Sequence, residues 1–78
     1  MKKLKFPDAF PYRVVEQRYA NAQTTNDLIE LAFHCFNRVE VYLKQESFYC
    51  ASAYLKIAKA IMSEILGYTY ESIDINHE

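Results

Sequence analysis

Residues that interrupt regular structure are scarce in this chain. Its 78 residues include one glycine, Gly67, and two prolines, Pro7 and Pro11. Because turns draw heavily on these residue types, their scarcity excludes a fold of many short strands and favours a few long helices. We therefore predict an all-α fold. A chain of this length encloses a single core, so we also predict one domain over residues 1–78.

Cysteine and net charge are low as well. Cys35 and Cys50 are too few for a disulfide framework, and their spacing does not suit a zinc site. The net charge of −1 provides no overall field toward nucleic acid or an anionic membrane. No uncharged apolar run is long enough to span a bilayer, and the basic start lacks the apolar segment of a signal peptide. We expect a cytoplasmic protein without membrane contacts, whose two thiols are reduced packing residues.

Apolar and aromatic side chains are abundant. Hydrophobic residues make up 51% of the chain and charged residues 24%, proportions typical of ordered globular proteins rather than disordered ones. The strongest helical pattern runs from Ser47 to Leu66. Its apolar residues recur at alternating steps of three and four, and they are Phe48, Ala51, Leu55, Ala58, Met62 and Ile65. Further apolar residues widen this stripe to about half the circumference, which requires neighbours on two sides.

Polar residues fill the other half of this helix. They are Ser52, Lys56, Lys59, Ser63 and Glu64, with Tyr49 among them. We predict a helix over Phe48–Leu66 that ends at Gly67, the residue type that best tolerates a left-handed backbone at a helix end.

A second helix is predicted over Asp27–Gln45, with Thr24 or Thr25 as its N-cap. Its apolar residues cover more than half the circumference, and they are Leu28, Ile29, Leu31, Ala32, Phe33, Cys35, Phe36, Val39, Tyr42 and Leu43. The polar gap at Gln45–Ser47, with Ser47 as a cap, favours a break before the third helix. The alternative is one continuous helix over residues 27–66, about 60 Å long.

A shorter first helix is predicted over Pro11–Ala22, started by Pro11 or capped by Asp8. Its apolar stripe is narrow, which indicates a helix laid on the outside of the others, and it consists of Tyr12, Val15, Tyr19 and Ala22. The predicted architecture is an antiparallel hairpin with this helix across it, a three-helix bundle with an N-terminal arm (1–10) and a C-terminal tail (67–78). Three helices leave part of the wide apolar faces uncovered, so we expect a two-fold homodimer to complete the bundle.

The segment Val39–Ala60 resembles the helix-turn-helix unit of tetratricopeptide-type repeats. The matching residues are Tyr42, a turn-packing Phe48, and the interlocking Ala51, Leu55 and Ala58. The segment departs from that pattern in having no turn glycine and no closing proline, and Val39 stands where a small residue is usual. No second copy of the unit occurs in the chain. The resemblance implies a way of packing two helices and agrees with a role in protein binding.

Residues with catalytic or metal-binding chemistry do not form a known pattern. His34, Cys35, Cys50 and His77 lack the spacing of a metal site, and Glu40 and Glu64 fall at the edges of apolar faces. The chain also lacks a glycine-rich phosphate loop and a nucleophile motif. We therefore predict a protein that is not an enzyme, with no catalytic residues, metal ligands or cofactor.

The aromatic residues outside the predicted core indicate an interaction surface instead. Tyrosine combines a large area with few rotatable bonds and a polar tip, which suits protein interfaces. The candidate interaction residues are Tyr49, Lys56, Lys59, Phe10, Tyr68 and Tyr70. The predicted function is a small regulatory module that dimerises and docks on an unidentified larger protein, which it inhibits or positions. One alternative is a nucleic-acid-binding regulator that uses the lysines of the arm and third helix, and another is an accessory subunit of a larger enzyme or chaperone complex.

Overall fold

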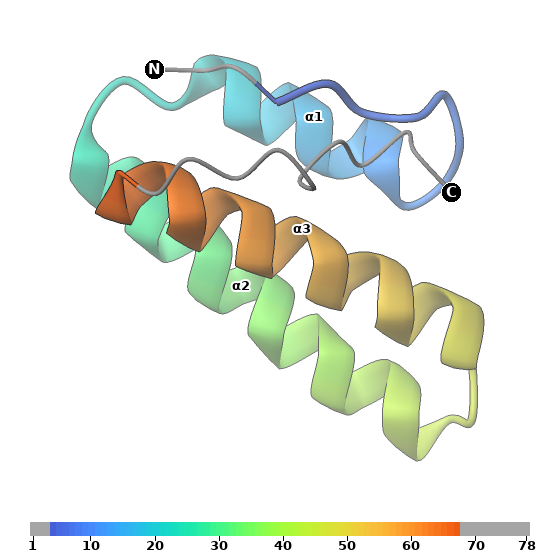
Figure 1. Cartoon of the computed structure of the whole chain (residues 1–78). Helices are drawn as coiled ribbons and strands as arrows, with labels where there is room; N and C mark the ends of the chain where they lie inside the picture. The colour runs from blue at the N-terminus through green and yellow to red at the C-terminus, as the bar shows by residue number, and fades with distance from the viewer. Residues whose placement is uncertain (1–3, 68–78) are drawn as a thin grey trace.

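The computed structural model describes residues 4–67, which form three α-helices (Figure 1). These are α1 (Tyr12–Asn21), α2 (Thr25–Lys44) and α3 (Phe48–Leu66). No strand occurs among the described residues, so the all-helical prediction is confirmed for them. Most of the predicted tail lies outside the described residues, as do Lys2 and Lys3 of the predicted arm.

The start of α2 is set by a capping box. The Thr24 hydroxyl accepts a hydrogen bond from the Asp27 backbone N–H at 3.1 Å, and the Asp27 carboxylate accepts one from the Thr24 backbone N–H at 3.2 Å. Each side chain thus satisfies a backbone donor that the first helical turn leaves free. The helix therefore begins two residues before the predicted start.

The break between α2 and α3 is a Schellman motif without glycine. The N–H of Ser47 donates to the Tyr42 carbonyl at 2.9 Å, and the N–H of Glu46 donates to the Leu43 carbonyl at 3.0 Å. Glu46 occupies the position that usually holds glycine, with a φ of 60°. Ser47 precedes α3 as predicted, but its side chain makes no capping hydrogen bond, so that part of the prediction is wrong.

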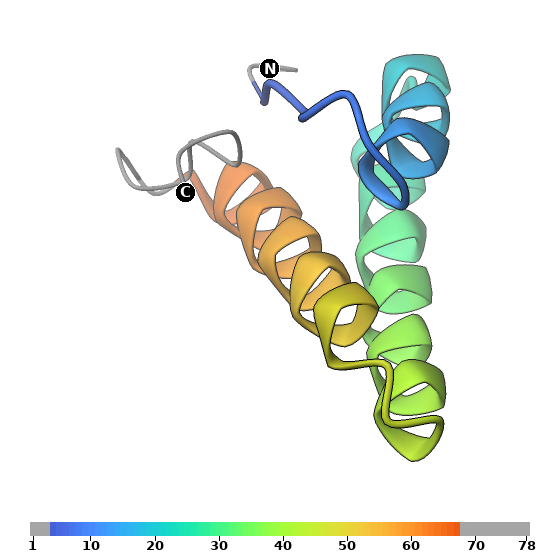
Figure 2. The same ribbon diagram turned by 90° about the vertical axis from the view of Figure 1, so that its right-hand side faces the viewer.

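The chain reverses at residues 45–47, and α3 then lies beside α2 in both views (Figures 1 and 2). Figure 2 shows α2 and α3 close together at this turn and farther apart at their other ends, where α1 and residues 4–11 lie. The core fills the space where all three helices meet. Its best-buried large side chains are Val15, Leu28, Cys35, Ile57 and Ile61.

The predicted stripe of α1 is confirmed. Tyr12, Val15, Tyr19 and the flanking Ala22 are all buried, while Arg13 and the other polar residues of this helix stay exposed. A narrow stripe fixes the orientation of a helix well because only one face can be buried at a gain in free energy. Of the two predicted starts, the cap at Asp8 does not form, since its carboxylate pairs with the Arg13 guanidinium, and Pro11 takes the N-cap position.

The buried face of α3 agrees with the predicted apolar arc only in part, since Ala51 and Ala58 of the predicted stripe are buried. Phe48 is 63% exposed and Leu55 is 38% exposed, although both were expected in the core. Ser63, expected on the polar half, is buried, and its hydroxyl donates to the Lys59 carbonyl at 2.9 Å. When apolar residues cover half of a helix, the sequence does not show which of them lie deepest in the core. On α3 the contacts with α1 and α2 determine this. The residues buried on α3 are Ala51, Ala53, Tyr54, Ile57, Ala58, Ala60, Ile61 and Ser63.

The apolar arc of α2 is also wide, and only some of its residues are buried. Its buried residues are Leu28, Leu31, Ala32 and Cys35, while Phe33 and Leu43 are exposed against expectation. Residues near the turn are less enclosed because α1 lies at the other end of the helix pair in both views (Figures 1 and 2). The resemblance to a tetratricopeptide-type unit also fails at Phe48, whose ring does not pack into the turn.

Candidate interaction surfaces

Two adjacent aromatic rings are exposed at the start of α3. Phe48 is 63% exposed and Tyr49 is 62% exposed, directly after the turn from α2. At about 100° per residue, Tyr49 shares its side of the helix with Ser52 and Lys56, which are also exposed. We call Tyr49, Ser52 and Lys56 the tip surface.

The other predicted interaction residues are distributed over the molecule. Lys59 is exposed but lies about 80° around α3 from Tyr49, closer to the side of Phe48 and Leu55. Phe10 is exposed just before α1, in a different element. Tyr68 and Tyr70 lie outside the described residues. Of the six candidates, Tyr49 and Lys56 therefore share one face.

A cluster of Arg38, Tyr42 and Tyr54 joins the turn-proximal parts of α2 and α3. The rings of Tyr42 and Tyr54 stack with centroids 5.6 Å apart and planes 13° apart. The Arg38 guanidinium lies 5.1 Å from the centre of the Tyr42 ring, and it donates a hydrogen bond to the Tyr42 hydroxyl at 3.4 Å. Stacking and cation–π contacts of this kind stabilise a helix pair beyond the burial of apolar area.

This cluster was missed at the level of sequence. Arg38 and Tyr42 are four residues apart on one helix, a spacing that places side chains in contact and was the available signal. Burial raises the pKa of Tyr54, as does the nearby Tyr42, while Arg38 acts in the opposite direction. Tyr54 is therefore a neutral packing residue at physiological pH.

The two cysteines occupy different environments. Cys35 is fully buried, and burial raises the pKa of its thiol to about 12, so the reactive thiolate is rare at neutral pH. Cys50 is half-buried at the start of α3. Across residues 4–67, no group of three His, Cys, Asp or Glu side chains is placed to hold a metal ion.

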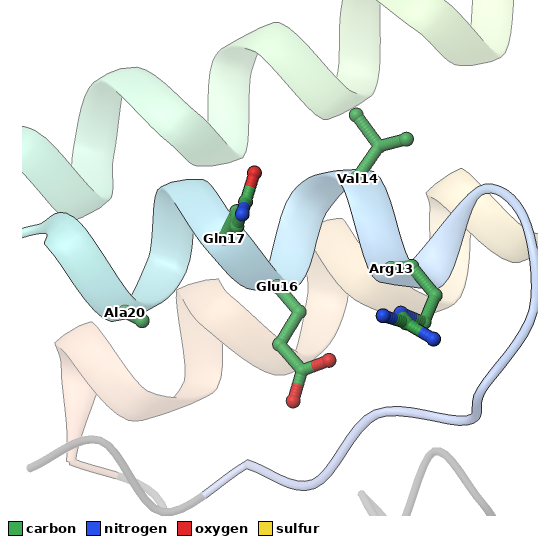
Figure 3. Close-up of a pocket in the computed structure, with 5 residues that line it drawn as sticks. All are labelled: Arg13, Val14, Glu16, Gln17 and Ala20. Carbon is green, nitrogen blue, oxygen red and sulfur yellow. The ribbon is translucent and has the colours of Figure 1, made fainter.

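Two concavities on the described part of the surface are shallow. One of about 490 Å³ is lined by Arg13, Val14, Glu16, Gln17 and Ala20 of α1 (Figure 3). All five residues come from a single helix, and Figure 3 shows Val14 and Glu16 pointing to opposite sides of it. A site that encloses a small ligand needs side chains that converge, usually from several elements. The shape of this concavity therefore does not support binding of a small molecule.

A smaller concavity of about 280 Å³ lies where α1 meets α2, lined by Arg18, Asn21, Ala22, Asp27, Glu30 and Leu31. It holds charges of both signs, and the Asp27 carboxylate is already engaged in the capping box.

Comparisons of the chain with protein-family models, with curated proteins and with solved structures find no match. Inferences about function therefore rest on the fold and the exposed side chains. Within the described part of the chain, no helix combines the length and apolar character needed to cross a membrane.

Proposed function

We propose that this protein is a non-catalytic binding module that acts as a homodimer and docks on a larger protein through its tip surface. The observation that carries the proposal is the exposure of Tyr49, at 62%, on one side of α3 with the exposed Ser52 and Lys56. Tyrosine is enriched among residues that dominate binding energy because its ring buries a large area and its hydroxyl can still find a partner. An aromatic side chain left in water contributes nothing to the hairpin itself.

In this proposal α2 and α3 act as an antiparallel hairpin that presents Tyr49 at a defined position. The Schellman motif at Glu46 and the stacked pair Tyr42–Tyr54 support this, because both restrict movement of the two helices near the turn. A surface that is rigid before binding loses less conformational entropy when a partner docks. The role toward the partner is inhibition or positioning, since the proposal assigns no residue to catalysis.

Site-specific photo-cross-linking tests the proposal. A photoreactive amino acid is placed at Tyr49 and, as a matched control, at Val14, which is 52% exposed on α1. In cells of the organism that encodes the protein, position 49 should yield a discrete cross-linked protein that position 14 does not. This experiment needs no purified partner.

Equal labelling from positions 49 and 14 would contradict a specific tip surface. Cross-linking to nucleic acid, with binding that falls steeply as salt increases, would favour the alternative of a regulator acting through Lys56 and Lys59. A cross-linked protein that belongs to an enzyme or chaperone complex would favour the accessory-subunit alternative.

A further inference from the structure

Three apolar residues of α3 are spaced seven apart on a poorly covered side. They are Phe48, Leu55 and Met62, of which the first two are exposed and the third is half-buried. Ala51 and Ala58, three residues after Phe48 and Leu55, are buried against the core. The stripe therefore has the alternating spacing of a coiled-coil seam. Its small residues and Met62 pack within the chain, whereas Phe48 and Leu55 are left exposed.

The same arrangement occurs on α2. Ile29, Phe36 and Leu43 are also spaced seven apart, with Leu43 exposed and the other two half-buried. Ala32, three residues after Ile29, is fully buried. Phe33 is exposed beside this row, and its ring lies 6.4 Å from that of Phe36. Both long helices thus carry a row of large apolar residues that the chain covers only in part.

These two rows lie on one side of the α2–α3 pair. α3 runs back along α2. In such an antiparallel pair, turning by the same angle about each helix axis, starting from the line of contact, leads to the same side of the pair. Both rows therefore lie on one face. The opposite flank of the pair is buried in the core that includes Val15 and Tyr19 of α1. This side, which we call the heptad face, combines four exposed residues with three half-buried ones, of which Phe36 and Met62 also pack against the core. Its members are Ile29, Phe33, Phe36, Leu43, Phe48, Leu55 and Met62.

We propose that the heptad face binds the heptad face of a second copy of this chain. This inference rests on the proposed homodimer and specifies its interface. A second copy supplies two rows with the same repeat of seven, so large side chains of the two copies meet at matching intervals. A two-fold axis sets α2 of one copy against α3 of the other. The two helix pairs then pack face to face as a four-helix bundle, with each α1 on the outside.

The charges at the edge of the face favour this occupant. Glu40 borders the row on α2 and Lys59 borders the row on α3, each four residues after a member of its row, and both are exposed. Opposite charges at such positions set the partner and the orientation of paired helices. Among the described residues Glu40 pairs with Lys44, at 3.1 Å and in an exposed setting, so it can exchange partners at low cost.

The overall charge of the chain also permits a dimer. The net charge of −1 means that two copies repel each other only weakly.

Sedimentation equilibrium at micromolar concentration tests the interface. The wild-type chain should have twice the 9.2 kDa chain mass. Leu55→Glu should raise the dimer dissociation constant at least 100-fold, whereas Val14→Glu, at a comparably exposed apolar residue of α1, should leave it unchanged. Circular dichroism of each variant checks that the helices persist.

A charge-reversal pair covers the case in which Leu55→Glu fails to fold. Glu40→Lys and Lys59→Glu should each weaken the dimer about tenfold, and the double variant should restore it. A wild-type monomer would overturn both this inference and the homodimer of the proposed function. A dimer that is unaffected by Leu55→Glu, or by charge reversal in folded variants, would overturn the heptad face alone. Cross-linking at Tyr49 reports separately on docking.

Discussion

The Tyr19 hydroxyl donates a hydrogen bond to Oε1 of Glu64 at 2.6 Å, joining residues 45 positions apart in the sequence. The same hydroxyl accepts a hydrogen bond from the Leu4 backbone N–H at 3.3 Å, and the Tyr19 ring lies 5.4 Å from that of Phe6. One tyrosine thus connects the N-terminal arm, α1 and the last turns of α3. Glu64, predicted at the edge of an apolar face, is therefore a partly buried structural residue.

Removing the Tyr19 hydroxyl should destabilise the fold. Hydrogen bonds to charged groups contribute about 1.5–3 kcal/mol, and Oε2 of Glu64 is already buried without a hydrogen-bond partner among the described residues. We expect Tyr19→Phe to lower the free energy of unfolding by about 2 kcal/mol in urea denaturation. In a Glu64→Ala background the same substitution should cost clearly less. Equal costs in the two backgrounds would show that the pair is not coupled.

The two thiols should react at different rates. Because the pKa of Cys35 is raised to about 12 and its side chain is fully buried, we expect an alkylating reagent at pH 8 to modify Cys50 in the folded protein and Cys35 only after unfolding. Mass spectrometry of the labelled peptides measures this. Cys35→Ala should lower the free energy of unfolding by about 1–2 kcal/mol, more than Cys50→Ala does. Rapid labelling of both thiols would contradict the assignment.

Protonation of His34 should weaken the fold. Burial, followed by the charges of Arg18 and Arg38, lowers the pKa of His34 from its ordinary value of 6.5. The unfolded state then binds this proton more readily than the folded state, so this contribution to stability is present above the unfolded-state pKa and decreases as the pH falls through it. Lowering the pH from about 7.5 to about 5.5 should reduce the melting temperature, and less so in His34→Gln. An NMR titration that gives His34 a pKa above 6.5 would contradict this.

Sequence periodicity predicted the helices well where the apolar stripe was narrow. The stripe of Tyr12, Val15 and Tyr19 covers one face, and burial follows it. The wide arc of α3 left its centre undetermined, so Phe48 and Leu55 were assigned to the core together with residues around Ile57. Periodicity counts apolar residues, whereas burial depends on where the neighbouring helices lie.

Residues outside the helices were harder to assign from the sequence. Phe6 lies in the arm, where no repeat indicates its direction, yet it is buried against Tyr19. The candidate site shows the same limit. The exposure of Tyr49 followed from its polar neighbours Ser52 and Lys56, while the heptad face required knowledge of which apolar residues α1 leaves uncovered.

Glycine at position 46 should stabilise the protein. Glu46 adopts a φ of 60° at the end of α2, a left-handed conformation that costs a non-glycine residue about 1 kcal/mol. We expect Glu46→Gly to raise the free energy of unfolding by about 0.5–1 kcal/mol, measured by urea denaturation. If residues 27–66 instead formed one continuous helix, glycine in its middle would lower stability by about 1 kcal/mol. The sign of the change thus distinguishes the two arrangements.

Tyr49 and Tyr54 should differ most clearly when each is replaced by alanine. Tyr54 is buried and stacks on Tyr42, so Tyr54→Ala leaves a cavity and removes the stacking contact, at a cost of about 3–5 kcal/mol in the free energy of unfolding. Tyr49 is 62% exposed, and Tyr49→Ala should change stability by no more than about 0.5 kcal/mol while weakening partner binding by about 2 kcal/mol or more. Thermal and urea denaturation measure the change in stability. Calorimetric titration with the partner that cross-linking identifies measures the change in binding.

Phe48→Ala is the matched control. Since Phe48 is equally exposed but lies on the heptad face, Phe48→Ala should weaken dimerisation and leave docking intact. If Tyr49→Ala destabilised the chain as severely as Tyr54→Ala, its ring would belong to the folded core and could not serve as the docking residue.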